Sequence, residues 1–106
     1  MNGKSAHEVI GKVVRVDVSG IGINSGELTV VIQTEHLGDV TVFAGVKPSE
    51  YDTTKPTPWK EYCMENDVFA SYVNLATTAY AFPGKRLWCS YIFFDKNRIN
   101  VLSLRD

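Results

Sequence analysis

The chain has 106 residues, 44% hydrophobic and 22% charged residues, and a formal net charge of −1, as expected of one globular domain. The near-zero charge argues against a strongly electrostatic nucleic-acid binder, and no apolar run approaches the roughly 20 residues of a membrane helix. The N-terminal residues contain no apolar signal core, so we expect a cytoplasmic protein with no membrane partner. We expect a single domain over residues 1–106, in which residues 1–8 are flexible.

The first strand is predicted around residues 13–18. There, Val14, Val16 and Val18 alternate with Arg15 and Asp17, which is the period of a half-buried strand. Residues 20–26 follow with three glycines and one asparagine, residue types that tolerate positive φ. This stretch therefore predicts a turn between strands.

Two further strands are predicted over residues 27–35 and 39–46. Each alternates apolar with polar or mixed positions, so that one face of each strand is apolar. The turn at 36–39 is too short for a parallel crossover. These strands are therefore expected to form an antiparallel hairpin.

The middle of the chain differs in character. Residues 47–58 contain three prolines and no sustained apolar period, which predicts a connecting loop. Residues 57–67 predict a short helix, because Thr57 can cap its start and Pro58 suits the first helical position. One face of this helix would carry Trp59, Tyr62 and Cys63.

Strands resume in the last third of the chain. Alternation over 67–75 and a nearly all-apolar run over 86–94 predict two more strands, and 99–104 predicts a closing one. Residues 95–98 read as a turn. The predicted fold is mainly β: a small five- to six-stranded antiparallel barrel, with one short helix between strands three and four.

This order of elements resembles the OB-fold. The segment 59–75, WKEYCMENDVFASYVNL, is similar to the passage in single-stranded-DNA-binding proteins where a short helix leads into strand four. That family usually has a glycine in the polar turn where this chain has Asn66, and the proline-bearing insert at 47–58 is not characteristic of it. An SH3-like or other small β-barrel is the alternative fold.

The resemblance implies a binding surface for single-stranded DNA or RNA. OB-folds commonly bind oligonucleotides across strands two and three and the flanking loops. In this chain the implied loops are 20–26 and 75–87, and the implied sheet positions are Thr29, Val31, Gln33, Thr41 and Phe43.

The stretch AYAFPGKRLW, residues 79–88, combines three aromatic side chains with two adjacent cations. Aromatic faces stack on bases and cations follow phosphates, which are the two requirements of single-strand binding. The same aromatics are equally compatible with sealing the barrel end. The candidate nucleic-acid-binding residues are Arg15, Gln33, Phe43, Tyr80, Phe82, Lys85, Arg86 and Trp88.

So few cations imply modest affinity for each protomer, which would favour a homo-oligomer through avidity. A small near-neutral binder of this kind would suit an accessory role in replication or recombination, for example in a mobile element.

Other chemistry finds little support in the sequence. Cys63 and Cys89 form no CxxC pair, and His7 and His36 are isolated, so we expect structural thiols and no metal site. There is no phosphate-binding loop with its lysine and no nucleophile–base arrangement. We therefore expect no cofactor and no enzymatic activity.

A second class of function stays open. Residues 27–67 carry eight anions and three cations, which favours a protein-binding module or an acidic mimic of nucleic acid. In that reading Glu50, Asp52 and Glu61 would make the contacts.

Overall fold

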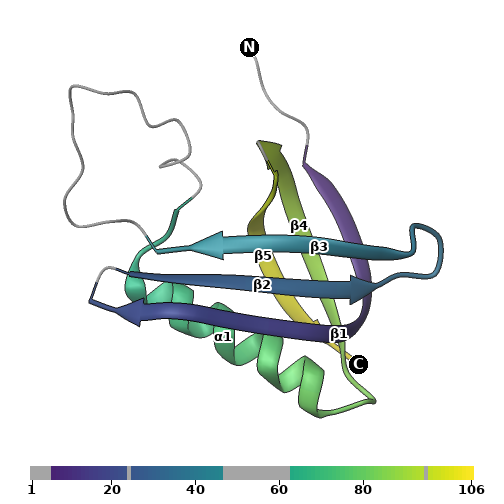
Figure 1. Ribbon diagram of the computed structural model, residues 1–106. Coiled ribbons are helices and arrows are strands. Elements are labelled where there is room, and N and C mark those ends of the chain that lie inside the picture. The colour runs from purple at the N-terminus through teal and green to yellow at the C-terminus, as the bar shows by residue number, and fades with distance from the viewer. Residues whose placement is uncertain (1–5, 24, 47–62, 95) are drawn as a thin grey trace.

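The computed structural model describes residues 6–23, 25–46, 63–94 and 96–106. These residues form five strands and one helix. In chain order (Figure 1) the elements are β1 (His7–Gly22), β2 (Ser25–Gln33), β3 (Asp39–Gly45), α1 (Asn66–Ala81), β4 (Arg86–Phe94) and β5 (Lys96–Arg105). The prediction of a mainly β chain with one helix between strands three and four is confirmed.

The strands close into a barrel in the order β1-β2-β3-β5-β4, so that β1 pairs with both β2 and β4. Its residues 7–11 pair with β4, and its residues 12–22 pair with β2. Four of the five junctions are antiparallel, but β3 and β5 run parallel where Phe43 pairs with Arg98. The predicted purely antiparallel barrel is wrong at this junction, since the chain passes through α1 and β4 before β5 closes against β3.

Gly11 lies where β1 leaves β4 and joins β2. A Cβ atom at this position would stand 2.0 Å from the backbone carbonyl oxygen of Gln33. Two backbones can approach this closely only where the side chain is absent. Gly11 therefore allows β1 to pair with both β4 and β2.

Alternate side chains of the strands fill the barrel interior, and the inward faces predicted for β2 and β3 are confirmed. The side chains that are at most 1% exposed on these two strands are Leu28, Val30, Ile32 and Val42. Leu87 and Cys89 of β4 are also fully buried. Burial raises the pKa of the Cys89 thiol to about 12, so this cysteine is an uncharged part of the core.

The helix occupies other residues than predicted. Residues 67–75, predicted as a strand, belong to α1, and of the predicted helix over 57–67 the part up to residue 62 lies outside the described residues. Cys63 and Met64 precede α1, and Met64 forms an isolated bridge with Val46. The face of α1 toward the barrel follows the helical period and includes Phe69, Tyr72, Val73, Ala76 and Ala79.

Helix α1 covers one side of the barrel (Figure 1). Its first turns pack on the β1–β2 hairpin, where a Cβ atom on Gly26 would lie 2.9 Å from the Phe69 ring. Further along, the Tyr72 hydroxyl donates to the Asn100 carbonyl at 2.9 Å. The helix is thus held by packing at its start and by a hydrogen bond to β5.

Two loop predictions also change. The stretch 75–87, predicted to join two strands, contains the end of α1 and the turn into β4, in which the Lys85 amide donates to the Phe82 carbonyl at 2.9 Å. The predicted turn at 95–98 is shorter, because β5 begins at Lys96. Lys96 and Arg98 are therefore strand residues two positions apart, so their side chains lie on the same face of the sheet.

Candidate nucleic-acid interface

The outer surface of β2 and β3 carries the five sheet positions implied by the resemblance. Their neighbours Leu28, Val30 and Val42 point into the core, so the predicted phase of both strands is confirmed. Four of the five are half-buried and one is exposed: Thr29, Val31, Thr41 and Phe43, with Gln33.

Cross-strand pairing arranges these side chains in rows across the barrel. One row runs from Asp17 of β1 through Thr29 and Phe43 to Arg98 of β5. Residues that pair directly lie within side-chain contact of each other on one face of a sheet. Phe43 therefore stands between a hydroxyl and a guanidinium.

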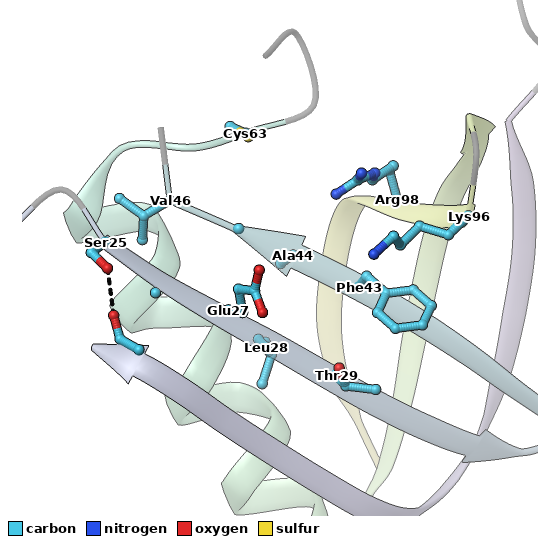
Figure 2. A pocket seen from close by; sticks show the side chains of 13 residues that line it. Ser25, Glu27, Leu28, Thr29, Phe43, Ala44, Val46, Cys63, Lys96 and Arg98 are labelled. Atoms are coloured by element: carbon cyan, nitrogen blue, oxygen red, sulfur yellow. Dashed lines mark hydrogen bonds between the residues drawn. The ribbon is translucent and has the colours of Figure 1, made fainter. Parts of the chain in front are cut away.

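A cavity of about 670 Å³ opens over this part of the surface (Figure 2). Its lining comes from the β1–β2 hairpin, from β2 and β3, from Cys63, and from the start of β5. Figure 2 shows Glu27 on one side of the cavity and the cationic groups of Lys96 and Arg98 on the other. The volume lies within the range of about 300–1,000 Å³ that is usual for small-ligand sites.

Lys96 makes a direct contact with the ring of Phe43, one of the candidate binding residues. Its Nζ atom lies 4.8 Å from the centre of the Phe43 ring, which is a cation–π geometry. The Asn97 side-chain amide donates to the Thr41 carbonyl at 2.9 Å and fastens β5 to β3 beside this contact. The start of β5 thereby brings positive charge to the aromatic ring.

Arg15 lies on the same outer surface, opposite Val31. It is exposed, and its Nε atom donates to Asp17 Oδ2 at 2.7 Å. Because both side chains are solvated, this ion pair holds Arg15 weakly.

Gln33 is exposed at the other end of β2. It lines a second cavity, of about 490 Å³, together with Ile10, Lys12, Leu37 and Arg86. The structure thus brings two of the predicted residues, Gln33 and Arg86, to one cavity. Phe43 lines the first cavity and not this one.

Tyr80 and Phe82 are exposed, with 56% and 60% of their surface accessible, and neither lines the cavity beside Phe43. Since α1 has 16 residues, it extends about 24 Å from its start at the β1–β2 hairpin to this end. Their exposure leaves them available to a ligand, but away from Phe43.

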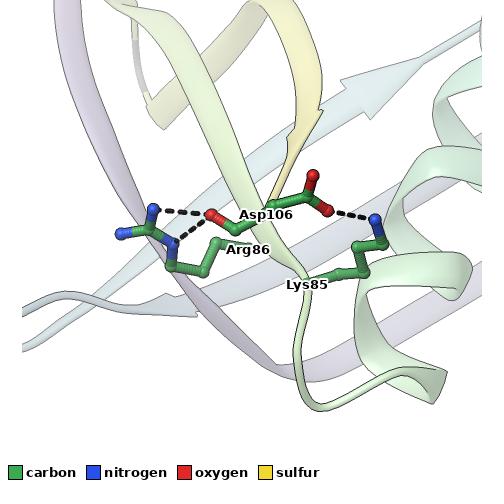
Figure 3. A network of polar contacts seen from close by, with 3 residues as sticks. All are labelled: Lys85, Arg86 and Asp106. Carbon is green, nitrogen blue, oxygen red and sulfur yellow. Dashed lines mark hydrogen bonds and ion pairs between the residues drawn. The ribbon is translucent and has the colours of Figure 1, made fainter.

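The predicted cations Lys85 and Arg86 are both bound to the C-terminal residue (Figure 3). Lys85 donates to the Asp106 carboxylate, and the Arg86 guanidinium donates to the Asp106 backbone oxygen at 2.7 and 3.2 Å. The hydrogen bond and charge of Lys85 lower the pKa of the Asp106 carboxyl. These contacts occupy part of the positive charge that the sequence offers to phosphates.

Trp88 lies on the outside of β4, on the face opposite to the buried Leu87 and Cys89. It pairs with Ile10 of β1 and Ser103 of β5, and the Arg105 guanidinium carbon lies 5.2 Å from the centre of its ring. Its partners differ from those of Phe43, so the two aromatics do not form one stripe.

Sequence reasoning missed Lys96, Arg98 and Glu27 as residues of this site. The polar run 95–98 predicts a turn, whereas in the structure β5 begins at Lys96 and carries both cations. The useful signal is that Arg98 directly precedes the core residue Ile99, so that in a strand the arginine faces outward.

No helix in the described part of the chain is long and apolar enough to cross a membrane. The described residues also contain no group of three or more His, Cys, Asp or Glu that could hold a metal ion. Of the acidic residues that the alternative function requires, Glu50, Asp52 and Glu61 lie outside the described residues.

The described residues form a small, closed, five-stranded β-barrel with one helix, an architecture consistent with an OB-like fold. Comparisons of the chain with protein-family models, with curated proteins and with solved structures find no match.

Proposed function

We propose that the protein binds single-stranded nucleic acid on the outer surface of β2, β3 and the start of β5. The observation that carries this proposal is the Phe43 ring, which lies beside a cavity of about 670 Å³ with Lys96 4.8 Å from the ring centre. A base stacks on the ring, and Lys96 and Arg98 contact the flanking phosphates. Arg15 extends the positive charge toward β1.

The residues of the α1–β4 turn have a smaller part in this proposal. Lys85 and Arg86 are bound to Asp106, and Tyr80 and Phe82 lie at the far end of α1 from the β1–β2 hairpin. They offer a separate, secondary contact for a longer strand.

With so few cations, binding to one protomer is weak and salt-dependent, and a homo-oligomer would gain affinity by presenting several such surfaces to one strand. We propose an accessory role in replication or recombination for such a weak, salt-dependent binder.

The test is fluorescence anisotropy with labelled oligo(dT) and a mixed-sequence single strand at low salt. Wild type is compared with Phe43→Ala and with the double variant Tyr80→Ala/Phe82→Ala. We expect Phe43→Ala to weaken binding by about 1–3 kcal/mol, the usual value of one stacked base. The double variant, which removes two exposed aromatics, is the matched control and should bind nearly as wild type.

Two results count against the proposal. Absence of binding by wild-type protein at low salt would reject single-strand binding altogether. If the double variant loses binding and Phe43→Ala binds as wild type does, the site lies at the end of α1.

A further inference from the structure

The cavity beside Phe43 carries charge of both signs. Lys96 and Arg98 enter it from β5, whereas Glu27 of β2 brings a carboxylate to the same lining (Figure 2). A carboxylate repels phosphate, so Glu27 does not serve the backbone of a nucleic acid. Its place in the lining calls for a ligand with a hydrogen-bond donor as well as a negative charge.

The register of β2 and β3 fixes where this carboxylate stands. Glu27 pairs with Gly45, and Thr29 pairs with Phe43, so Glu27 is the diagonal neighbour of Phe43 on the same face. Diagonal neighbours lie roughly 7–8 Å apart, which is within reach of long side chains. Since Gly45 has no side chain, nothing from that position stands between Glu27 and a ring stacked on Phe43.

The edge of such a ring then faces an acceptor. An ionised carboxylate accepts hydrogen bonds and donates none. Guanine offers two adjacent donors, N1–H and N2–H, that match the two carboxylate oxygens. Cytosine and adenine offer one amino group, while thymine and uracil offer a single N–H between two carbonyls that repel a carboxylate.

Resting on the proposed function, we infer that Glu27 reads the Watson–Crick edge of the base stacked on Phe43, and that this site prefers guanine over thymine or uracil. The base then points toward β2 and its phosphate toward Lys96 and Arg98. One nucleotide thus spans the cavity from its acidic to its basic side.

The experiment compares oligo(dT) with oligonucleotides of the same length that carry one central guanine, cytosine or adenine. A single guanine in a thymine background avoids guanine-rich secondary structure. Dissociation constants are measured by anisotropy for wild type, Glu27→Gln and Asp39→Asn. Asp39→Asn is the matched control, because it removes one negative charge from exposed Asp39, which pairs with Gln33 outside the cavity.

We expect wild type to bind the guanine oligonucleotide about tenfold more tightly than oligo(dT), within the range of a good side-chain–base pair. Glu27→Gln should bring the two dissociation constants close together, since the glutamine side chain both donates and accepts hydrogen bonds. This expectation holds whether or not the substitution changes the overall affinity. Asp39→Asn should keep it. Circular dichroism verifies that both variants, each isosteric and at an exposed position, are folded.

The outcomes separate this inference from the function on which it rests. Equal binding of all four oligonucleotides by wild type, with loss in Phe43→Ala, overturns the role of Glu27 and leaves single-strand binding standing. A guanine preference that survives Glu27→Gln also overturns it. No binding of any oligonucleotide rejects both.

Discussion

The ammonium group of Lys96 lies over the ring of Phe43, 4.8 Å from its centre. In the free protein the lysine therefore covers part of the surface on which a base would stack. An exposed cation–π contact contributes about 0.5–1 kcal/mol and a stacked base about 1–3 kcal/mol. In the proposed complex the base would displace the ammonium, and Lys96 would then reach a phosphate beside the ring.

This exchange predicts the salt dependence of binding. The slope of log K against log salt concentration is negative, and Lys96→Ala should reduce its magnitude by about 0.7, the value for one phosphate on a single strand. Lys85→Ala is the matched control, because Lys85 already pairs with Asp106, and its slope should equal that of wild type. The measurement is anisotropy at several salt concentrations. Equal slopes for Lys96→Ala and wild type would show that Lys96 meets no phosphate.

The close approach at Gly11 predicts a large effect on folding stability. Gly11→Ala places a Cβ atom 2.0 Å from the Gln33 carbonyl oxygen, so β1 must move away from β2. We expect a loss of about 3 kcal/mol or more in the free energy of unfolding. Gly84→Ala meets no atom within 4 Å and should change stability little. Urea denaturation of both variants tests this, and similar midpoints would refute the account of the barrel junction.

The same packing explains which parts of the fold the sequence could predict. Every second residue of β2 and β3 is apolar, so their phase and the outward position of Phe43 follow from the pattern. Residues 67–75 alternate too, but Phe69, Tyr72, Val73 and Ala76 also have a helical spacing. Contact with the barrel decides for the helix, and a local pattern does not contain that contact.

The site was predicted only in part for a related reason. Phe43 follows from its own strand, whereas Lys96 and Arg98 reach it through the parallel pairing of β3 with β5. This pairing joins segments that α1 and β4 separate in the chain, so no local sequence pattern predicts it. The stretch 79–88, rich in the expected residue types, spans instead the end of α1, the following turn and the start of β4.

The buried thiol of Cys89 predicts a pH dependence of stability. Burial raises its pKa from 9.0 to about 12, so between these values the unfolded chain loses a proton that the folded chain keeps. Stability should fall in this window by up to about 1.4 kcal/mol for each pH unit. Urea denaturation of wild type and Cys89→Val at pH 8, 9 and 10 isolates the effect. Parallel pH profiles would contradict the assignment.

The C-terminal contact predicts a shift in the opposite direction. The hydrogen bond and charge of Lys85 lower the pKa of the Asp106 carboxyl, so the contribution of this pair is present above the ordinary carboxyl value. It is lost as the pH falls through the lowered value. An NMR titration should give Asp106 a lower pKa in wild type than in Lys85→Ala. The same pKa in both proteins would mean that the pair does not form in solution.

Binding at the Phe43 surface is tested most directly by a chemical-shift titration of isotope-labelled protein with a short single strand. We expect the amides of Thr29, Phe43 and Arg98 to shift most. Those of Tyr80, Phe82 and Lys85 should change little. Shifts confined to the end of α1 and its turn into β4, or no shifts at all, would contradict binding at the Phe43 surface.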